Sequence, residues 1–99
     1  MPHFAVHSKE DNVGVAITDI KKGEEVEGVY IDDGSPGPKL IALEDIPLGH
    51  KIALKDIKTG ERVIKYGRPI GVATKDIKTG EHVHTHNLKS IRWGTLSKR

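Results

Sequence analysis

The chain has 99 residues, of which 35% are hydrophobic and 30% charged, and its net charge of +2 comes from 16 basic and 14 acidic residues mixed along its length. This balance and the low aromatic content of 4% argue against a nucleic-acid partner, and no apolar run approaches the roughly 18 residues of a membrane span. Without cysteine the chain cannot form a disulfide or a thiolate metal site by itself, and its start, M-P-H-F-A-V-H, is not that of a signal peptide, so a cytoplasmic protein is expected.

Short segments of β-type composition follow one another along the chain. Several alternate apolar and polar residues, and no stretch keeps a helical apolar period with capping signals. The Gly/Pro-rich stretch D-D-G-S-P-G-P-K at 32–39 is predicted as a loop, and Y-G-R-P at 66–69 as a turn. The predicted strands are 13–18, 25–31, 40–43, 51–54, 62–65, 70–74 and 81–86.

These segments predict one all-β domain of many short strands over residues 1–99. Residues 88–93 carry no clear pattern, and a short basic tail begins at about residue 89. The order of the strands does not follow from the pattern.

One phrase occurs four times: Asp-Ile, two residues, Gly, two residues, then Val or Ile. The aspartate can bond backbone amides two residues on, the first Ile can anchor the turn in the core, and Gly permits a positive φ. The closing Val or Ile is expected to be the first inward residue of the next strand. The copies lie at 19–26, 45–52, 56–63 and 76–83.

The copies begin 26, 11 and 20 residues apart, which is not the fixed period of a stacked solenoid. We interpret the phrase as a corner that is reused within one compact domain. Structural roles are therefore predicted for its aspartates, Asp19, Asp45, Asp56 and Asp76.

Three histidines alternate with other residues in the stretch G-E-H-V-H-T-H-N at 80–87. Successive side chains of a strand point to opposite faces, so in an extended chain His82, His84 and His86 would share one face and Val83 the other. That face is either a set of ligands or a solvated surface, and the pattern alone leaves both open.

Four motifs together resemble the SAF domain of the altronate/galactarate dehydratase family. They are D-N-V-G-V-A-I-T-D-I-K-K-G (11–23), I-P-L-G-H-K-I-A-L (46–54), V-I-K-Y-G-R-P-I-G-V-A-T (63–74) and G-E-H-V-H-T-H-N-L (80–88). The resemblance implies a β-clip fold, as in type III antifreeze proteins, covering residues 1–99 as a single SAF domain.

The resemblance also implies the small subunit of a metal-dependent hydro-lyase that dehydrates a sugar acid such as altronate or galactarate. Such a subunit is expected to need a large catalytic subunit for activity, and self-association is left open. In some members the domain is fused to the catalytic region; here S-I-R-W-G-T-L-S-K-R follows the histidines in place of an Arg/Gly/Asp-rich linker, which favours a separate subunit. The alternatives are a sulfolactate sulfo-lyase small subunit, a non-catalytic carbohydrate-binding module and a purely structural subunit.

The family reaction, a β-elimination next to a carboxylate, suggests roles for the histidines. A divalent metal can act as Lewis acid in such a reaction, and neutral imidazole is a common ligand of iron and zinc. We expect Fe²⁺, with Mn²⁺, Mg²⁺ or Zn²⁺ as alternatives, bound by His82, His84 and His86. His50 is expected to be catalytic, as a general base, or else a third ligand beside His84 and His86.

Four further residues are candidates for contact with the acid. Lys65 could meet a substrate carboxylate and the Tyr66 hydroxyl could donate a hydrogen bond, so both are predicted as catalytic, although a surface lysine and a packed tyrosine are equally ordinary. Lys51 and Asn87 are predicted to bind substrate, and Asn87 could instead orient an imidazole or bond its own turn. His3 and His7 are expected to be exposed and without a role.

Overall fold

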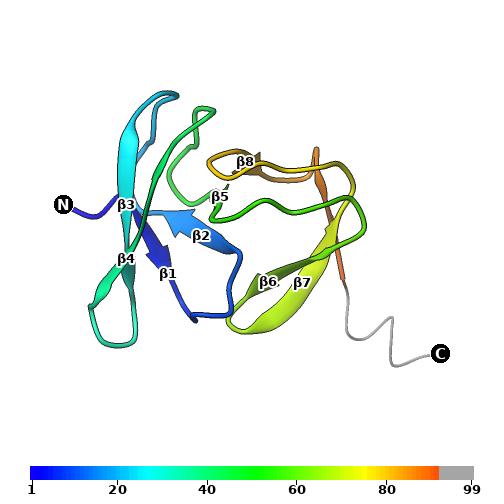
Figure 1. The fold of residues 1–99 in the computed structure, drawn as a ribbon, viewed down its shortest axis with the longest axis horizontal. Coiled ribbons are helices and arrows are strands. Elements are labelled where there is room, and N and C mark those ends of the chain that lie inside the picture. The colour runs from blue at the N-terminus through cyan, green and yellow to red at the C-terminus, as the bar shows by residue number, and fades with distance from the viewer. Residues whose placement is uncertain (92–99) are drawn as a thin grey trace.

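Short strands joined by turns make up residues 1–91, the part of the chain that the computed structural model describes (Figure 1). These residues contain no helix, so the all-β prediction is confirmed, and none of them forms a helix that could span a membrane. The strands are β1 (Phe4–Val6), β2 (Val13–Ala16), β3 (Glu25–Tyr30), β4 (Pro36–Ile41), β5 (Lys51–Ala53), β6 (Arg62–Lys65), β7 (Arg68–Ala73), β8 (His82–Val83) and β9 (Leu88–Ser90).

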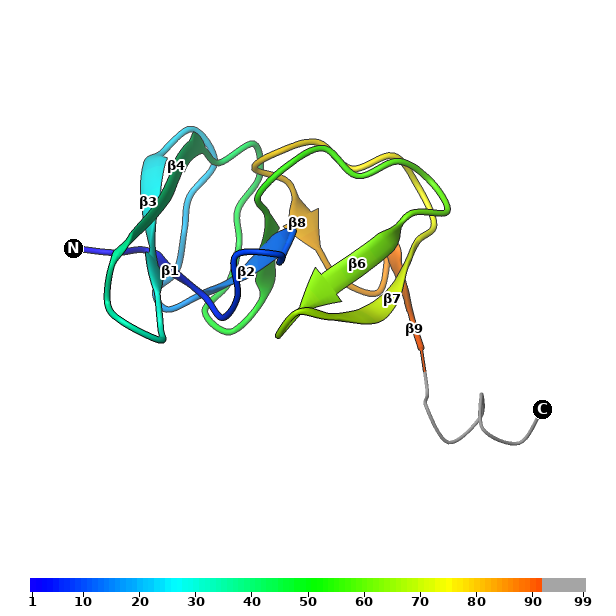
Figure 2. The ribbon, with the colours of Figure 1, turned by 60° about the horizontal axis from the view of Figure 1, so that its bottom comes forward.

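Two sheets hold these strands. The larger has the order β4-β3-β1-β2-β5-β8, and the smaller has the order β6-β7-β9. β1 and β3 pair in parallel, whereas the other pairs are antiparallel. Figures 1 and 2 show β3 and β4 at one end of the molecule, β6, β7 and β9 toward the other, and β2, β5 and β8 between them.

The loop predicted at 32–39 is wrong in its second half, because Pro36–Ile41 forms β4. β4 is an edge strand that pairs with β3 alone, and an edge position tolerates proline, which has no N–H to donate. β1 and β9 were not predicted either. β1 is buried along its whole length and so shows no alternation, and β9 has three residues. The rest of the predicted tail, with Trp93, lies outside the described residues.

The four corners associate as two pairs. Backbone bridges join Ile20 to Ile46 and Ile57 to Ile77, and all four of these isoleucines are buried. Each aspartate accepts an amide N–H from the other corner of its pair, and not from its own turn as predicted from the sequence. In the first pair of corners, Asp19 accepts the Leu48 N–H at 2.9 Å and Asp45 accepts the Lys22 N–H at 2.8 Å. In the second pair, Asp56 accepts the Thr79 N–H and Asp76 accepts the Thr59 N–H, both at 2.9 Å. The structural role predicted for the aspartates is confirmed, and so is the positive φ of the corner glycines.

The second pair of corners predicts a specific sensitivity to acid. Bonds from the backbone and hydroxyl of Thr79 lower the pKa of Asp56, and bonds from those of Thr59 lower the pKa of Asp76. A carboxyl whose pKa is depressed on folding stabilises the fold above its unfolded pKa of about 3.9 and loses that contribution as the pH falls through the folded value. The melting temperature should therefore fall more steeply between about pH 5 and pH 2 in the wild type than in an Asp56→Asn/Asp76→Asn variant. Parallel curves would contradict this.

Two hydrophobic clusters lie on opposite faces of the central strands. In β5, Ile52 belongs to the first cluster and Ala53 to the second, as alternation along a strand requires. The closing residue of each corner is buried, as predicted. The first cluster contains Phe4, Val6, Ala16, Ile20, Val26, Leu40, Ala42, Ile46 and Ile52, and the second contains Val13, Ala53, Ile57, Val63, Ala73, Ile77 and Val83.

A buried carboxylate joins the β1–β2 loop to the turn between β6 and β7. Asp11, which is 3% exposed, accepts N–H bonds from Ser8, Tyr66 and Gly67 at 3.1, 3.1 and 2.8 Å. Tyr66 has a φ of 59°, which is unusual for a residue with a side chain. The three bonds account for a turn in which a non-glycine residue adopts this backbone conformation.

Candidate metal centre

Three imidazoles gather where β5 meets β8. The antiparallel register places Ile52 opposite His82, and His50 precedes Ile52 by two residues. The side chains of His50, Ile52 and His82 therefore lie on one side of the sheet. His50 Nδ1 and His82 Nε2 are 2.8 Å apart, and the rings of His50 and His84 stack with centroids 4.4 Å apart. One nitrogen from each of the three histidines lies within 4.8 Å of the other two.

A turn, rather than an extended strand, brings His84 to this point. The strand predicted at 81–86 is wrong beyond Val83, because β8 ends there and the chain turns over residues 84–87. Asn87 fixes this turn: its Oδ1 accepts the His84 N–H at 2.9 Å, and its Nδ2 donates to the His82 carbonyl at 2.8 Å. The His86 ring lies 5.4 Å from that of His82, but it is not one of the three that converge.

The surroundings of His82 favour its neutral form. Burial is the largest influence and lowers the pKa of His82, and the neighbouring His50, His86 and His84 lower it further, whereas Glu44 opposes them. Glu44 Oε1 also accepts the His82 backbone N–H at 2.8 Å. Because a histidine binds a metal through a neutral ring nitrogen, this environment suits a ligand.

The corner repeat itself marks His50 as exceptional. In three of the copies a glutamate follows the glycine and accepts the amide N–H of the residue three places earlier. In the remaining copy that earlier residue is Pro47, which has no N–H to donate, and His50 replaces the glutamate. The His50 N–H itself donates to the Pro47 carbonyl at 2.9 Å. The imidazole is thus free to face β8. The three glutamate bonds are Lys21 to Glu24, Lys58 to Glu61 and Lys78 to Glu81, at 2.6, 2.6 and 2.7 Å.

Three other predicted site residues form a second group on the described part of the chain. Lys51 pairs with Val83 and so faces away from His82. Burial, together with the charge of Lys65, lowers the pKa of Lys51, and Lys65 Nζ lies 5.0 Å from the Tyr66 ring centroid. Figure 1 places the turn between β6 and β7 toward the bottom of the molecule and β8 toward its top. The roles predicted for Lys51, Lys65 and Tyr66 stay predictions.

Asn87 lies within the histidine turn, and the substrate contact predicted for it stays a prediction. Its side chain is 5% exposed, and both its oxygen and its nitrogen bond the backbone of the histidine turn. Of the two further alternatives left open by the sequence, the structure favours the one in which Asn87 bonds its own turn.

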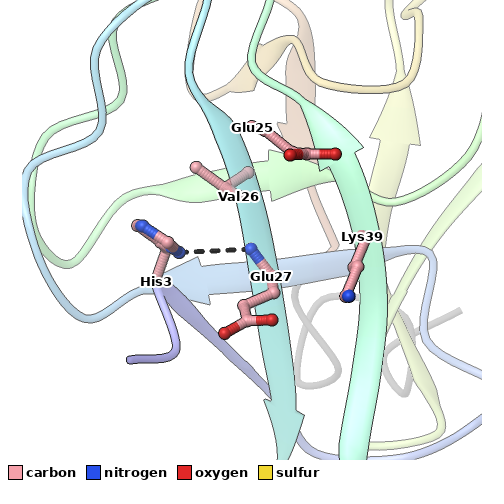
Figure 3. Close-up of a pocket in the computed structure, with 5 residues that line it drawn as sticks. All are labelled: His3, Glu25, Val26, Glu27 and Lys39. Atoms are coloured by element: carbon pink, nitrogen blue, oxygen red, sulfur yellow. Dashed lines mark hydrogen bonds between the residues drawn. The ribbon is translucent and has the colours of Figure 1, made fainter.

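The two N-terminal histidines are half-buried, contrary to the exposure predicted for them. The His7 ring stacks on Tyr66 with centroids 3.8 Å apart, and His3 Nδ1 accepts the Glu27 N–H at 3.2 Å. His3 also lines a shallow cavity of about 210 Å³ beside β3 and β4, shown in Figure 3. The other lining residues are Glu25, Val26, Glu27 and Lys39, so none of the converging histidines takes part.

Nine short strands folded around paired corners, within residues 1–91, define a SAF domain of the β-clip class. The family described as the altronate/galactarate dehydratase SAF domain matches residues 2–91. The chain belongs to this family, as its motifs indicated.

Named relatives fall into two groups. The chain is 43% identical over 90 residues to altronate dehydratase of Bacillus subtilis and 42% identical over 90 residues to altronate dehydratase of Escherichia coli, in each case over 91% of this chain and 17% of the relative. It is 38% identical over 91 residues to (2R)-sulfolactate sulfo-lyase subunit alpha of Chromohalobacter salexigens, over 91% of this chain and 96% of the relative. The chain therefore spans a small part of the dehydratases but nearly all of the sulfo-lyase subunit.

Proposed function

We propose that this chain is the small subunit of a cytoplasmic hydro-lyase that dehydrates a sugar acid such as altronate or galactarate, acting with a large catalytic subunit. The observation that carries the proposal is the convergence of His50, His82 and His84 in a domain of this family. Relatives named altronate dehydratase support the reaction class, because they contain this domain within longer chains.

The three histidines are suited to hold a divalent ion, and Fe²⁺ is our first choice. Ligand nitrogens about 2.1 Å from one ion lie at most roughly 4.2 Å apart. The nitrogens of His50, His82 and His84 already lie within 4.8 Å of one another, so modest rotation of the rings is enough to reach that spacing. When bound, the ion would supply a Lewis acid for β-elimination.

The residues of this chain prepare such a centre in two ways. His50 and His82 share a hydrogen bond between ring nitrogens, so the proton between them must leave when both nitrogens turn to a cation. His84 is exposed and leaves one side of the cluster open, which is where substrate oxygens or donors of the large subunit could complete the coordination. His86, whose ring lies beside that of His82, does not belong to the converging set.

The sulfo-lyase small subunit is the second candidate function. It is favoured by one observation: the relative called subunit alpha matches this chain over 96% of its own length. The same arrangement of histidines serves either function, because loss of water and loss of sulfite are both eliminations beside a carboxylate.

Reconstitution tests the proposal. The chain mixed with its large catalytic subunit is expected to consume altronate or galactarate, whereas each component alone should be nearly inactive, because the small domain lacks room for a full acid-binding site. Mass spectrometry of the keto acid formed checks this, with sulfolactate as a parallel substrate. Turnover by the large subunit alone at the same rate would reject the subunit role, and sulfite release from sulfolactate without dehydration would select the second candidate.

A further inference from the structure

Three residues that differ from their counterparts in the other corner copies meet at one place. The residue before the corner aspartate is Glu44 in one copy, where the other copies have Thr18, Lys55 and Lys75. His50 replaces the glutamate that follows the glycine in the other three copies, and His82 occupies the next, variable position, where the other copies have Glu25, Lys51 and Arg62. Glu44 accepts the His82 N–H, and His82 in turn contacts His50. Residues that the fold does not require at these positions are thus in mutual contact.

Glu44 connects the β4–β5 loop to the strand that carries His82. The adjacent residue, Leu43, donates its N–H to the Gly80 carbonyl at 2.9 Å, and Glu44 Oε1 accepts the His82 N–H at 2.8 Å. These two bonds hold the start of β8 against the loop that leads to His50. Glu44 is not among the groups that converge as ligands, so any effect that it has on a bound ion passes through His82.

Asn87 holds the other side of the histidine turn. Its side chain is 5% exposed and bridges the carbonyl of His82 and the N–H of His84. Without this bridge, both backbone groups would lose a partner in a partly buried place, and the turn would be closed by the backbone bond from the Asn87 N–H to the His84 carbonyl, at 3.1 Å. Buried amides with both ends bonded commonly fix one loop conformation.

We propose that Glu44 and Asn87 are positioning residues that pre-organise His82 and His84 for a divalent metal, without binding it themselves. This inference rests on the metal centre of the proposed function. Groups that orient metal ligands typically change metal affinity by about 10–100-fold when they are removed.

Titration of the purified chain with Zn²⁺ alone, followed by calorimetry, tests the inference. Glu44→Ala and Asn87→Ala are each expected to weaken Zn²⁺ binding by about 10–100-fold. Glu44→Gln retains an oxygen that can accept the His82 N–H, so it should recover most of the affinity, with a loss below about tenfold. The matched control is Glu61→Ala, which removes a carboxylate–amide bond from a corner away from the histidines and should bind Zn²⁺ as the wild type does.

The outcomes separate this inference from the proposed function. If the wild type takes up no Zn²⁺, the metal centre and this inference both fail. If the wild type binds and the folded Glu44→Ala and Asn87→Ala variants bind equally well, only the positioning role is overturned. Recovery by Glu44→Gln but not by Glu44→Ala, at similar melting temperatures, supports positioning over a general loss of stability, and equal weakening in Glu61→Ala overturns it.

Discussion

Replacing His50 and His82 together by alanine is expected to weaken binding of Zn²⁺ or Fe²⁺ by at least about a thousandfold. A zinc site with four protein ligands binds with roughly 10–16 kcal/mol, so one ligand contributes about 3 kcal/mol and two contribute enough for this loss. The two rings come from different corners, and their nearest nitrogens are 2.8 Å apart. Removing both leaves His84 as the one remaining member of the cluster. Calorimetry of the isolated chain measures the effect, and turnover of the reconstituted enzyme should fall with it.

The matched control is His3→Ala/His7→Ala, which also removes two half-buried histidines but leaves the cluster intact. It should retain the metal affinity of the wild type. If both double variants bind metal alike, the ion is held elsewhere. If metal affinity is lost but turnover with the large subunit is unchanged, the chain has a structural role in that enzyme and the metal is incidental to the reaction.

Replacing Gly80 by alanine is expected to destabilise the fold by roughly 3–5 kcal/mol, whereas the same change at Gly60 should cost about 1–2 kcal/mol. Both glycines lie in the identical phrase K-D-I-K-T-G-E, with φ of 91° and 87°. A methyl group on Gly60 would meet nothing within 4 Å, but on Gly80 it would lie 2.1 Å from the Ile41 carbonyl oxygen. That oxygen belongs to β4 and cannot turn aside as a flexible side chain could.

Chemical denaturation of the two variants measures this difference, and each serves as the control of the other. The positive φ is common to both positions, so the additional loss of unfolding free energy in Gly80→Ala measures the clash with β4 alone. Equal losses would mean that β4 moves away at little cost. In that event the metal affinity of Gly80→Ala should still fall, because Leu43 and Glu44 lie two and three residues beyond the end of β4 and are bonded to Gly80 and His82.

The corners were the most predictable part of the fold. Their Asp, Ile and Gly have local physical reasons, and the buried Ile20, the positive φ of Gly23 and the inward Val26 follow from them. The exchange of aspartates between corners could not be predicted, since a repeat does not state which copies are partners. β4 was missed because its prolines indicate a loop unless the strand is known to be at an edge.

The candidate site was predictable in composition but not in geometry. His82 and His84 were singled out by alternation along an extended strand, but a turn closed by Asn87 is what brings His84 to the cluster. His50 is predicted as a catalytic base or third ligand, and the substitution of histidine for the repeated glutamate, three residues after Pro47, is a stronger signal for it. Glu44 was missed, because nothing about one glutamate in a charged sequence shows that it reaches a backbone amide 38 residues away.

The reciprocal aspartate bonds make each pair of corners a unit whose two members must form together. The two chain closures span 26 and 20 residues, and their entropic free-energy costs differ by only about 0.2 kcal/mol, so loop closure by itself favours neither half over the other. His50 belongs to the first unit and His82 to the second. An ion bound by both histidines would therefore link the two units, and its binding would require both of them to be folded.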